Sequence, residues 1–170
     1  MTSFTDTELE QLLSAVVNPQ HRAFLMLGYY HGARRGEILA LTGADVQNGH
    51  VTITRLKRRR RFVSTHPLHP VERELVEKLA SEAGLSRLFP WSASKASHLV
   101  QSYLRGLGIY TSPYQKALHS LRHSCGRRIY QSSKNIVDVA TYLGHANIES
   151  ARRYVHADES EVSKAAISCL

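Results

Sequence analysis

The sequence predicts a mainly α-helical domain with one small antiparallel β-sheet or hairpin, an α+β fold. Apolar residues recur at a spacing of three to four over most of the chain, which is typical of amphipathic helices. Strict alternation of apolar and polar residues is confined to a stretch near residues 51–65. The chain has 170 residues, a hydrophobic fraction of 42% and no Pro/Gly/Ser-rich linker, so we expect a single domain over 1–170.

Three helices are expected within the first 43 residues. The sequence Thr5-Asp6-Thr7-Glu8 has the spacing of a capping box, in which the first and fourth side chains each bond the other's backbone, and predicts a helix start. A mostly buried helix is expected over 21–31, interrupted at Gly32. A short helix over 35–41 follows, with Gly43 as its stop.

The alternating stretch predicts two β-strands. Val51 and Ile53 alternate with threonines, a charged run follows, and the segment 62–65 supplies a second β-branched arm, so we expect a hairpin. Helical spacing then returns. The further helices are expected from about Val71 to Gly84, and over 94–106, 117–131, 134–143, 147–155 and 159–168.

The net charge indicates a polyanionic partner. Lys and Arg number 22 against 14 acids, giving +8 and a pI near 9.8, and nucleic acid is the first candidate. The longest apolar run, Phe24 to Tyr30, is too short to span a bilayer, and no secretory signal is visible. Cys125 and Cys169 cannot form a disulfide framework, so a cytosolic setting is expected.

Two basic clusters could bind phosphate. In Gly32-Ala33-Arg34-Arg35-Gly36-Glu37, an arginine stands at a predicted helix start, where anions are favoured; the alternative is an arginine simply paired with Glu37. The run Arg55-Leu56-Lys57-Arg58-Arg59-Arg60-Arg61 would form the hairpin tip, either against DNA or as a solvated loop. Lys57 alone in this run could donate a proton, because a guanidinium effectively cannot lose one.

Two later clusters hold groups suited to proton transfer. His119 and Arg122 lie on one helical face and could reach a single phosphate. A metal site with His123 is disfavoured, because the segment lacks the glutamate of an H-E-x-x-H motif and its surroundings are basic. Tyr154 could act as a nucleophile only with help from cations or a base; otherwise it is a half-buried core tyrosine.

The order and spacing of these clusters resemble the catalytic domain of the tyrosine recombinases, the phage-integrase family. The resemblance covers essentially the whole chain. The matching blocks are Gly32 to Glu37 for G-x-R-x-x-E, Arg55-Leu56-Lys57 for the hairpin lysine, His119-Ser120-Leu121-Arg122 for H-x-x-R, Leu143-Gly144-His145 for L-G-H, and Arg152 to His156 around the nucleophile.

The resemblance implies a role for each matched residue. Arg34 and Arg122 would bind the scissile phosphate, and Tyr154 would attack it to give a 3′-phosphotyrosyl link. Lys57 would protonate the leaving 5′-oxygen. His119 would assist proton transfer from the tyrosine, His145 would hydrogen-bond the phosphate, and Glu37 would orient neighbouring side chains. No metal, ATP or other cofactor is implied.

The resemblance also implies partners. Double-stranded DNA would be the substrate, contacted through the backbone phosphates by the hairpin arginines Arg55, Arg58, Arg59, Arg60 and Arg61. A homotetramer on DNA is expected, with the helix over 159–168 docking on a neighbour, and accessory DNA-bending proteins are compatible with it. No membrane partner is expected.

One departure from the family concerns its length. Most members carry an N-terminal helical domain that completes a clamp around DNA, whereas residues 1–170 here match a catalytic domain alone, with no N-terminal core-binding domain. Three other functions stay open. They are a DNA-binding regulator without catalysis, a type IB topoisomerase-like relaxing enzyme, and a metal-dependent nuclease.

Overall fold

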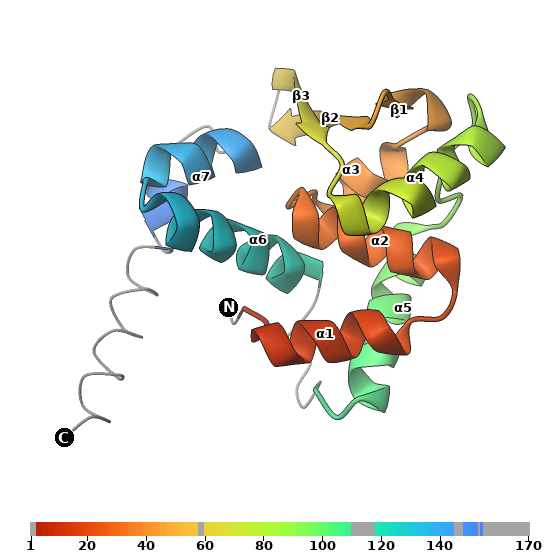
Figure 1. The fold of residues 1–170 in the computed structure, drawn as a ribbon, viewed down its shortest axis with the longest axis horizontal. Coiled ribbons are helices and arrows are strands. Elements are labelled where there is room, and N and C mark those ends of the chain that lie inside the picture. The colour runs from red at the N-terminus through yellow and green to blue at the C-terminus, as the bar shows by residue number, and fades with distance from the viewer. Residues whose placement is uncertain (1–2, 58–59, 110–117, 145–147, 153, 155–170) are drawn as a thin grey trace.

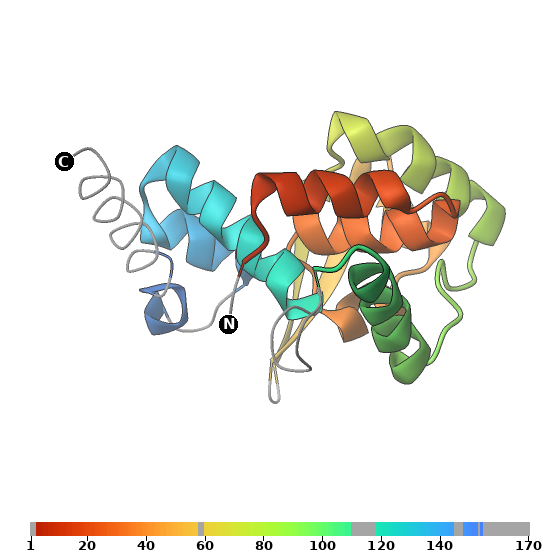
Figure 2. The ribbon, with the colours of Figure 1, turned by 90° about the horizontal axis from the view of Figure 1, so that it is seen from below.

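The computed structural model consists of a helical body with a small sheet at one side (Figure 1). It describes residues 3–57, 60–109, 118–144, 148–152 and 154. Figure 2 shows α1 (Asp6–Ala15) and α2 (Pro19–Tyr30) lying side by side over the rest of the body, and α6 (Leu118–Ser133) running from them toward α7 (Ile136–Leu143). The mainly α-helical α+β prediction is confirmed.

The first helices begin at side-chain caps. Helix α1 (Asp6–Ala15) starts at the predicted capping box, in which the Glu8 backbone N–H donates to Thr5 Oγ1 over 3.2 Å and the Thr5 N–H donates to the Glu8 carboxylate over 2.9 Å. Helix α2 (Pro19–Tyr30) starts with proline at its first position, and α3 (Arg35–Ala40) follows a sharp turn.

The sheet has three antiparallel strands in the order β1-β2-β3. The predicted hairpin is formed by β2 (His50–Lys57) and β3 (Arg60–Pro67), and β1 (Val46–Gln47) adds a short edge that the sequence pattern did not predict. Gly43 begins the 3₁₀ turn η1 (Gly43–Asp45), two residues beyond Leu41, the C-cap of α3, instead of only ending that helix. A Cβ there would lie 2.8 Å from the backbone nitrogen of Gly84.

The remaining helices follow the predicted ranges within a few residues. They are α4 (Pro70–Ala83), α5 (Ala93–Gly106), α6 (Leu118–Ser133), α7 (Ile136–Leu143) and the 3₁₀ turn η2 (Ile148–Ala151). Helix α7 ends at Gly144, which has a left-handed φ of 64°. The helix expected over 159–168 lies outside the described residues.

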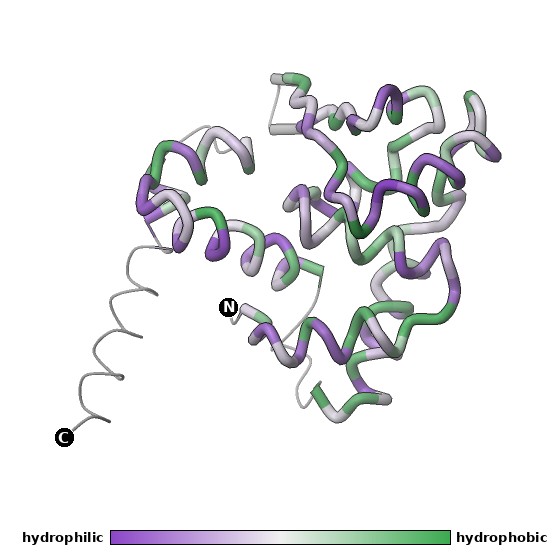
Figure 3. Tube along the Cα trace, viewed as in Figure 1, coloured by the Kyte–Doolittle hydropathy of each residue, from purple (hydrophilic) through white to green (hydrophobic). Residues whose placement is uncertain are grey.

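Two apolar clusters hold the fold. The larger one is contributed by α1 to α5, the sheet and the first turn of α6, and includes an aromatic group in which the Phe24 ring lies 5.3 Å from Phe89 and 5.5 Å from Trp91. The smaller one joins α6, α7 and η2. Figure 3 shows apolar and polar residues alternating along α1, as the burial of one helix face requires. In α2 the residues from Ala23 to Gly28 are all buried, so this part of the helix lies inside the body on all sides. In the part of the chain that is described, no helix is long and apolar enough to cross a bilayer.

Candidate active site

The turn between α2 and α3 is the centre of the site. Gly32 has a φ of 58°, a conformation that a residue with a Cβ adopts only with strain. A Cβ at this position would also collide with the Leu143 side chain and lie 3.3 Å from Cys125 Sγ. Glycine therefore lets the turn pack directly against α6 and α7, and the next residues carry Arg34 to the surface.

Arg34 is fixed by the glutamate one helical turn away. Its backbone N–H and its Nη1 donate to the two carboxylate oxygens of Glu37, over 2.8 and 2.7 Å. Burial raises the pKa of Glu37, but the bond from the Arg34 N–H and the charges of Arg55 and Arg34 outweigh it and hold that pKa below its ordinary value. The Arg34 side chain keeps a third of its surface exposed, so an anion can reach it.

Arg122 is aimed at the same turn from α6. Its Nη2 donates to the Leu143 carbonyl over 2.6 Å, and its Nη1 donates to the Gly32 carbonyl. Burial, the charge of Arg34 and that of Arg55 lower the pKa of Arg122 to about 10, so it stays charged at neutral pH. Positive charges gathered in a partly dry site favour an anion between them.

His119 lies one turn before Arg122 and beside a cavity of about 320 Å³. The cavity is lined by Arg34, Arg35, Gly36, Ser97, Val100, Gln101, Leu118 and His119. Partial burial and the charges of Arg122, Arg35 and Arg34 lower the pKa of His119. Its imidazole is therefore neutral at physiological pH and able to accept a proton.

Tyr154 packs against the middle of α6. It has 3% of its surface exposed, and its ring centroid lies 4.9 Å from that of His123. A Cβ at Gly126 would lie 2.7 Å from the tyrosine hydroxyl oxygen, so the absence of a side chain there makes room for the ring. The candidate nucleophile is thus buried against α6, the helix that carries His119 and Arg122.

Several predicted residues fall outside what the structure describes. His145, Arg58 and Arg59 are among them. The backbone of Lys57 pairs with Arg60 at the end of the hairpin, but the side chains of residues 56, 57, 60 and 61 are not described. Their assigned roles stay predictions.

The assignment of Arg55 to the DNA-contacting arginines is wrong. Its side chain has no exposed surface and forms an ion pair with Glu37, with Nη1 2.9 Å from Oε2. The reason lies in the strand period: residues 51, 53 and 55 share one face of β2, and Val51 and Ile53 are fully buried. Extending the alternation by one step would have placed Arg55 inside.

Sequence reasoning also missed a buried polar group beneath the site. His31 Nε2 lies 2.6 Å from Glu72 Oε1, with both side chains inside the protein. The His66 ring lies 5.6 Å from that of His31, and burial, then Arg55 and His31, lower the pKa of His66 to about 4. Glu72 lies in the first turn of α4, where acidic residues are usually exposed, so the sequence did not indicate that it is buried.

The disfavoured metal site has no support from the side chains present. Within the described residues, no three His, Cys, Asp or Glu side chains gather as metal ligands would. Cys125 instead donates to the Tyr30 carbonyl, and burial raises the pKa of its thiol to about 11.

The sequence of this chain is similar to those of several known proteins. Residues 2–161 match the model of the phage integrase family. The type 1 fimbriae regulatory protein FimE of Escherichia coli K12 is 31% identical over 166 residues, covering 88% of this chain and 83% of FimE. The tyrosine recombinase XerH of Helicobacter pylori is 28% identical over 190 aligned residues, covering 97% of this chain and 51% of XerH. The chain thus spans about half the length of that relative.

Solved structures show the same fold. XerH bound to a palindromic difH substrate in a post-cleavage complex superposes with a TM-score of 0.77 at 24% identity, covering 97% of this chain and 52% of XerH. The catalytic domain of bacteriophage HP1 integrase gives a TM-score of 0.72 at 24% identity, covering 92% of this chain and 88% of that domain.

Proposed function

Because the chain belongs to the phage integrase family, we propose that it is a site-specific DNA recombinase that cuts and rejoins DNA through Tyr154. The observation that carries the proposal is the convergence of Arg34 and Arg122 on the turn at Gly32, next to the helix against which Tyr154 packs. Double-stranded DNA is the substrate, as in the recombinase–DNA complexes of the same fold.

Arg34 and Arg122 would bind the scissile phosphate. Two guanidinium groups supply the charge that stabilises the extra negative charge of the transition state. Arg34 is held at its base by Glu37 and Arg122 by two backbone carbonyls, so both cations are oriented before DNA arrives. The metal-free chemistry expected from the sequence is consistent with this arrangement.

Cleavage would form one bond and break another on the same phosphorus. The Tyr154 oxygen attacks, its proton passes to the neutral imidazole of His119, and the bond to the 5′-oxygen breaks. Lys57 protonates that oxygen, and His145 hydrogen-bonds the phosphate. The 3′-phosphotyrosyl ester keeps the bond energy, so a 5′-hydroxyl can reverse the step without ATP. Because Tyr154 is buried against α6, its side chain has to move away from that helix to reach DNA.

We further propose the assembly that this chemistry needs. Exchange between two duplexes requires four cleavages, so the active species would be a homotetramer on DNA, with accessory DNA-bending proteins as further partners. A DNA substrate would place the protein at the nucleoid of its host cell. Residues 1–170 would act as a catalytic domain.

A second candidate is a DNA-binding regulator of the same fold. The name of its relative FimE, a fimbriae regulatory protein, and the burial of Tyr154 favour it. Relaxation of supercoiled DNA, as by a type IB topoisomerase, would use the same cleavage step without strand exchange.

The test is covalent trapping on DNA. The chain is mixed with a pool of nicked half-site duplexes from the region around its own gene, with EDTA present, and resolved on denaturing gels. Tyr154→Phe is the variant and Tyr130→Phe is the matched control. Tyr130 lies near the end of α6, away from His119 and Arg122, with its ring 5.7 Å from the Lys134 ammonium.

An EDTA-resistant adduct from the wild type and Tyr130→Phe, absent in Tyr154→Phe, would support the proposal. Salt-sensitive binding with no adduct would favour the regulator. Cleavage that EDTA abolishes, with no adduct, would indicate a metal-dependent nuclease. Plasmid relaxation without exchanged products would indicate the topoisomerase-like activity.

A further inference from the structure

Arg55 is the buried cation that contacts most of the elements around the site. Its Nε donates to Ser64 Oγ on the neighbouring strand over 3.0 Å. Its two terminal nitrogens reach three other parts of the chain. They donate to Glu37 Oε2 (2.9 Å), the His31 carbonyl (3.0 Å), the Tyr142 carbonyl (3.3 Å) and the Gly32 carbonyl (3.5 Å).

These acceptors are the ones that hold the two phosphate-binding arginines. Glu37 holds Arg34 through its backbone and its Nη1. The Gly32 carbonyl is also the acceptor of Arg122 Nη1. Arg55 therefore touches the anchors of both cations without facing the surface itself.

Arg55 also reaches the segment that leads to the L-G-H block. Its acceptor Tyr142 precedes Leu143, whose carbonyl receives Arg122 Nη2. The Phe62 ring of β3 lies over Gly144, where a Cβ would meet the ring carbon Cε2 at 2.9 Å. The part of the hairpin next to its tip and the end of α7 are thus held to each other by a hydrogen bond and a ring contact.

Stability alone does not account for this arrangement. A buried ion pair stabilises a fold little more than apolar residues of the same volume would. What a guanidinium adds is a planar fork whose donors have fixed directions, so several acceptors are held at set positions at once. Lysine carries the same charge but cannot do this.

We infer that Arg55 is a positioning residue of the recombinase site: its buried guanidinium holds the α2–α3 turn, α7 and the hairpin at one point and thereby orients Arg34 and Arg122 toward the scissile phosphate. The inference rests on the proposed function, because it assigns the phosphate to these two arginines. It adds to the machinery a charged residue that is buried and acts through the anchors of Arg34 and Arg122.

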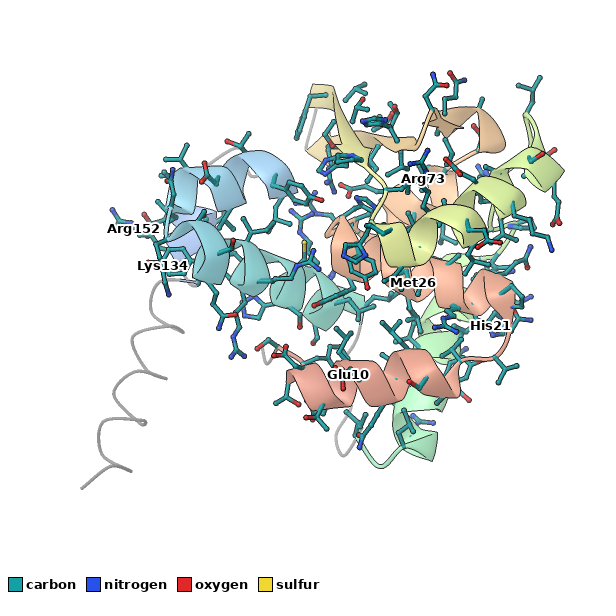
Figure 4. The ribbon with its side chains drawn as sticks, viewed as in Figure 1. Glu10, His21, Met26, Arg73, Lys134 and Arg152 are labelled. Atoms are coloured by element: carbon teal, nitrogen blue, oxygen red, sulfur yellow. The ribbon has the colours of Figure 1, made fainter. Side chains whose placement is uncertain are left out.

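The first variant is Arg55→Lys, with Arg73→Lys as the matched control. Arg73 is exposed on α4 and pairs with Glu77 over 3.1 Å, and its place on that helix is labelled in Figure 4. We measure single-turnover adduct formation on a trapped half-site at saturating protein, the Kd for that half-site, and thermal unfolding. Because misplacement by about 1 Å can cost a site about 10²-fold in rate, we expect Arg55→Lys to be slowed by about that factor with an unchanged Kd.

A second substrate distinguishes a defect in phosphate binding by Arg34 and Arg122 from a defect in protonation of the leaving group by Lys57. In a half-site with a 5′-bridging phosphorothiolate, the leaving group is a thiolate that needs no protonation. A variant that lacks Lys57 should therefore regain its cleavage rate on this substrate. We expect Arg55→Lys to stay equally slow on it, because its contacts are with the anchors of Arg34 and Arg122. Restoration to the wild-type rate would overturn the inference by showing that Arg55 acts through the hairpin lysine.

If Arg55→Lys does not fold, the double variant Arg55→Met/Glu37→Met removes both buried charges together, which a fold tolerates better than loss of one. Because Glu37 itself holds Arg34, the double variant is compared with Glu37→Met alone, and slower cleavage of the bound half-site by the double variant supports the inference. Cleavage at the wild-type rate by either variant overturns it. No adduct from the wild type would instead overturn the proposed function, so the two failures are distinguishable.

Discussion

The Gly32 carbonyl accepts a hydrogen bond from Nη1 of Arg122, although the two residues are 90 positions apart. The turn that delivers Arg34 to the surface therefore also orients the second phosphate-binding arginine. This link requires a close approach of backbone to α6 and α7, and the approach in turn requires a residue with no Cβ and a positive φ.

Gly32→Ala should consequently destabilise the fold and misplace Arg122. A left-handed non-glycine residue costs about 1–2 kcal/mol, and overpacking against Leu143 adds about 1–3 kcal/mol, so we expect a loss of about 2–5 kcal/mol in the free energy of unfolding. Urea denaturation measures it. Gly106→Ala is the control, because a Cβ there meets nothing within 4 Å. Equal stability of the two variants would contradict the packing argument.

Gly126→Ala should displace Tyr154 from α6. The new methyl group would lie 2.7 Å from the tyrosine hydroxyl oxygen, so the buried ring, which belongs to the apolar cluster of α6, α7 and η2, would have to move. We expect faster nitration of Tyr154 by tetranitromethane, followed by peptide mass spectrometry. Tyr142, whose hydroxyl donates to the Tyr30 carbonyl, is the internal reference and should keep its rate. An unchanged Tyr154 rate would show that the ring does not need the glycine.

Much of the fold could be predicted from the sequence, because its signals are local. The capping box at Thr5 and the alternation at Val51 and Ile53 report on structure within a few residues, and both elements formed as predicted. The start of η1 at Gly43 depends instead on a close approach to Gly84, 41 positions away in the numbering, which no local pattern carries.

The site was predictable to a lesser depth. Spacing on a helix predicted that His119 and Arg122 share a face of α6. The same reasoning failed for Arg55, because six cations in seven residues suggest a solvent-exposed segment and hide the period-2 pattern that buries one of them. The burial of Tyr154 depends on the space left by Gly126, which is a contact between residues 28 positions apart that no local pattern shows.

The stability of the fold should fall in mild acid through His66. Its pKa is lowered to about 4 by burial, Arg55 and His31, against 6.5 for an ordinary histidine. Between these two values the unfolded chain binds a proton that the folded chain does not, so the free energy of unfolding decreases as the pH falls through this window. Urea midpoints from pH 7 to pH 4 measure the effect. In His66→Gln the slope over this window should become shallower, and an unchanged slope would assign it to other groups.

The acid limb of the cleavage rate should have its midpoint below 6.5, the ordinary pKa of histidine. His119 has its pKa lowered by partial burial and by Arg122, Arg35 and Arg34, and only its neutral imidazole accepts the tyrosine proton. Protonation therefore stops the reaction only at a pH beneath the ordinary histidine value. Single-turnover adduct formation across pH 5–8 tests this. His119→Gln should remove the acid limb and lower the plateau by about 10²-fold or more. An acid limb that persists in this variant would assign the limb to another group.

The hairpin arginines should contribute to DNA binding through phosphate contacts, whereas Arg55 should not. Each neutralised phosphate adds about 0.9 to the slope of log K against log salt concentration, so Arg58→Gln, Arg59→Gln, Arg60→Gln or Arg61→Gln should each reduce the slope by up to that amount. Arg55 has no exposed surface and is already paired with Glu37, so Arg55→Lys should leave the slope unchanged while slowing cleavage. Fluorescence anisotropy at several salt concentrations measures both. A slope lowered in Arg55→Lys would mean that this guanidinium reaches DNA after all, and that the buried network opens when DNA binds.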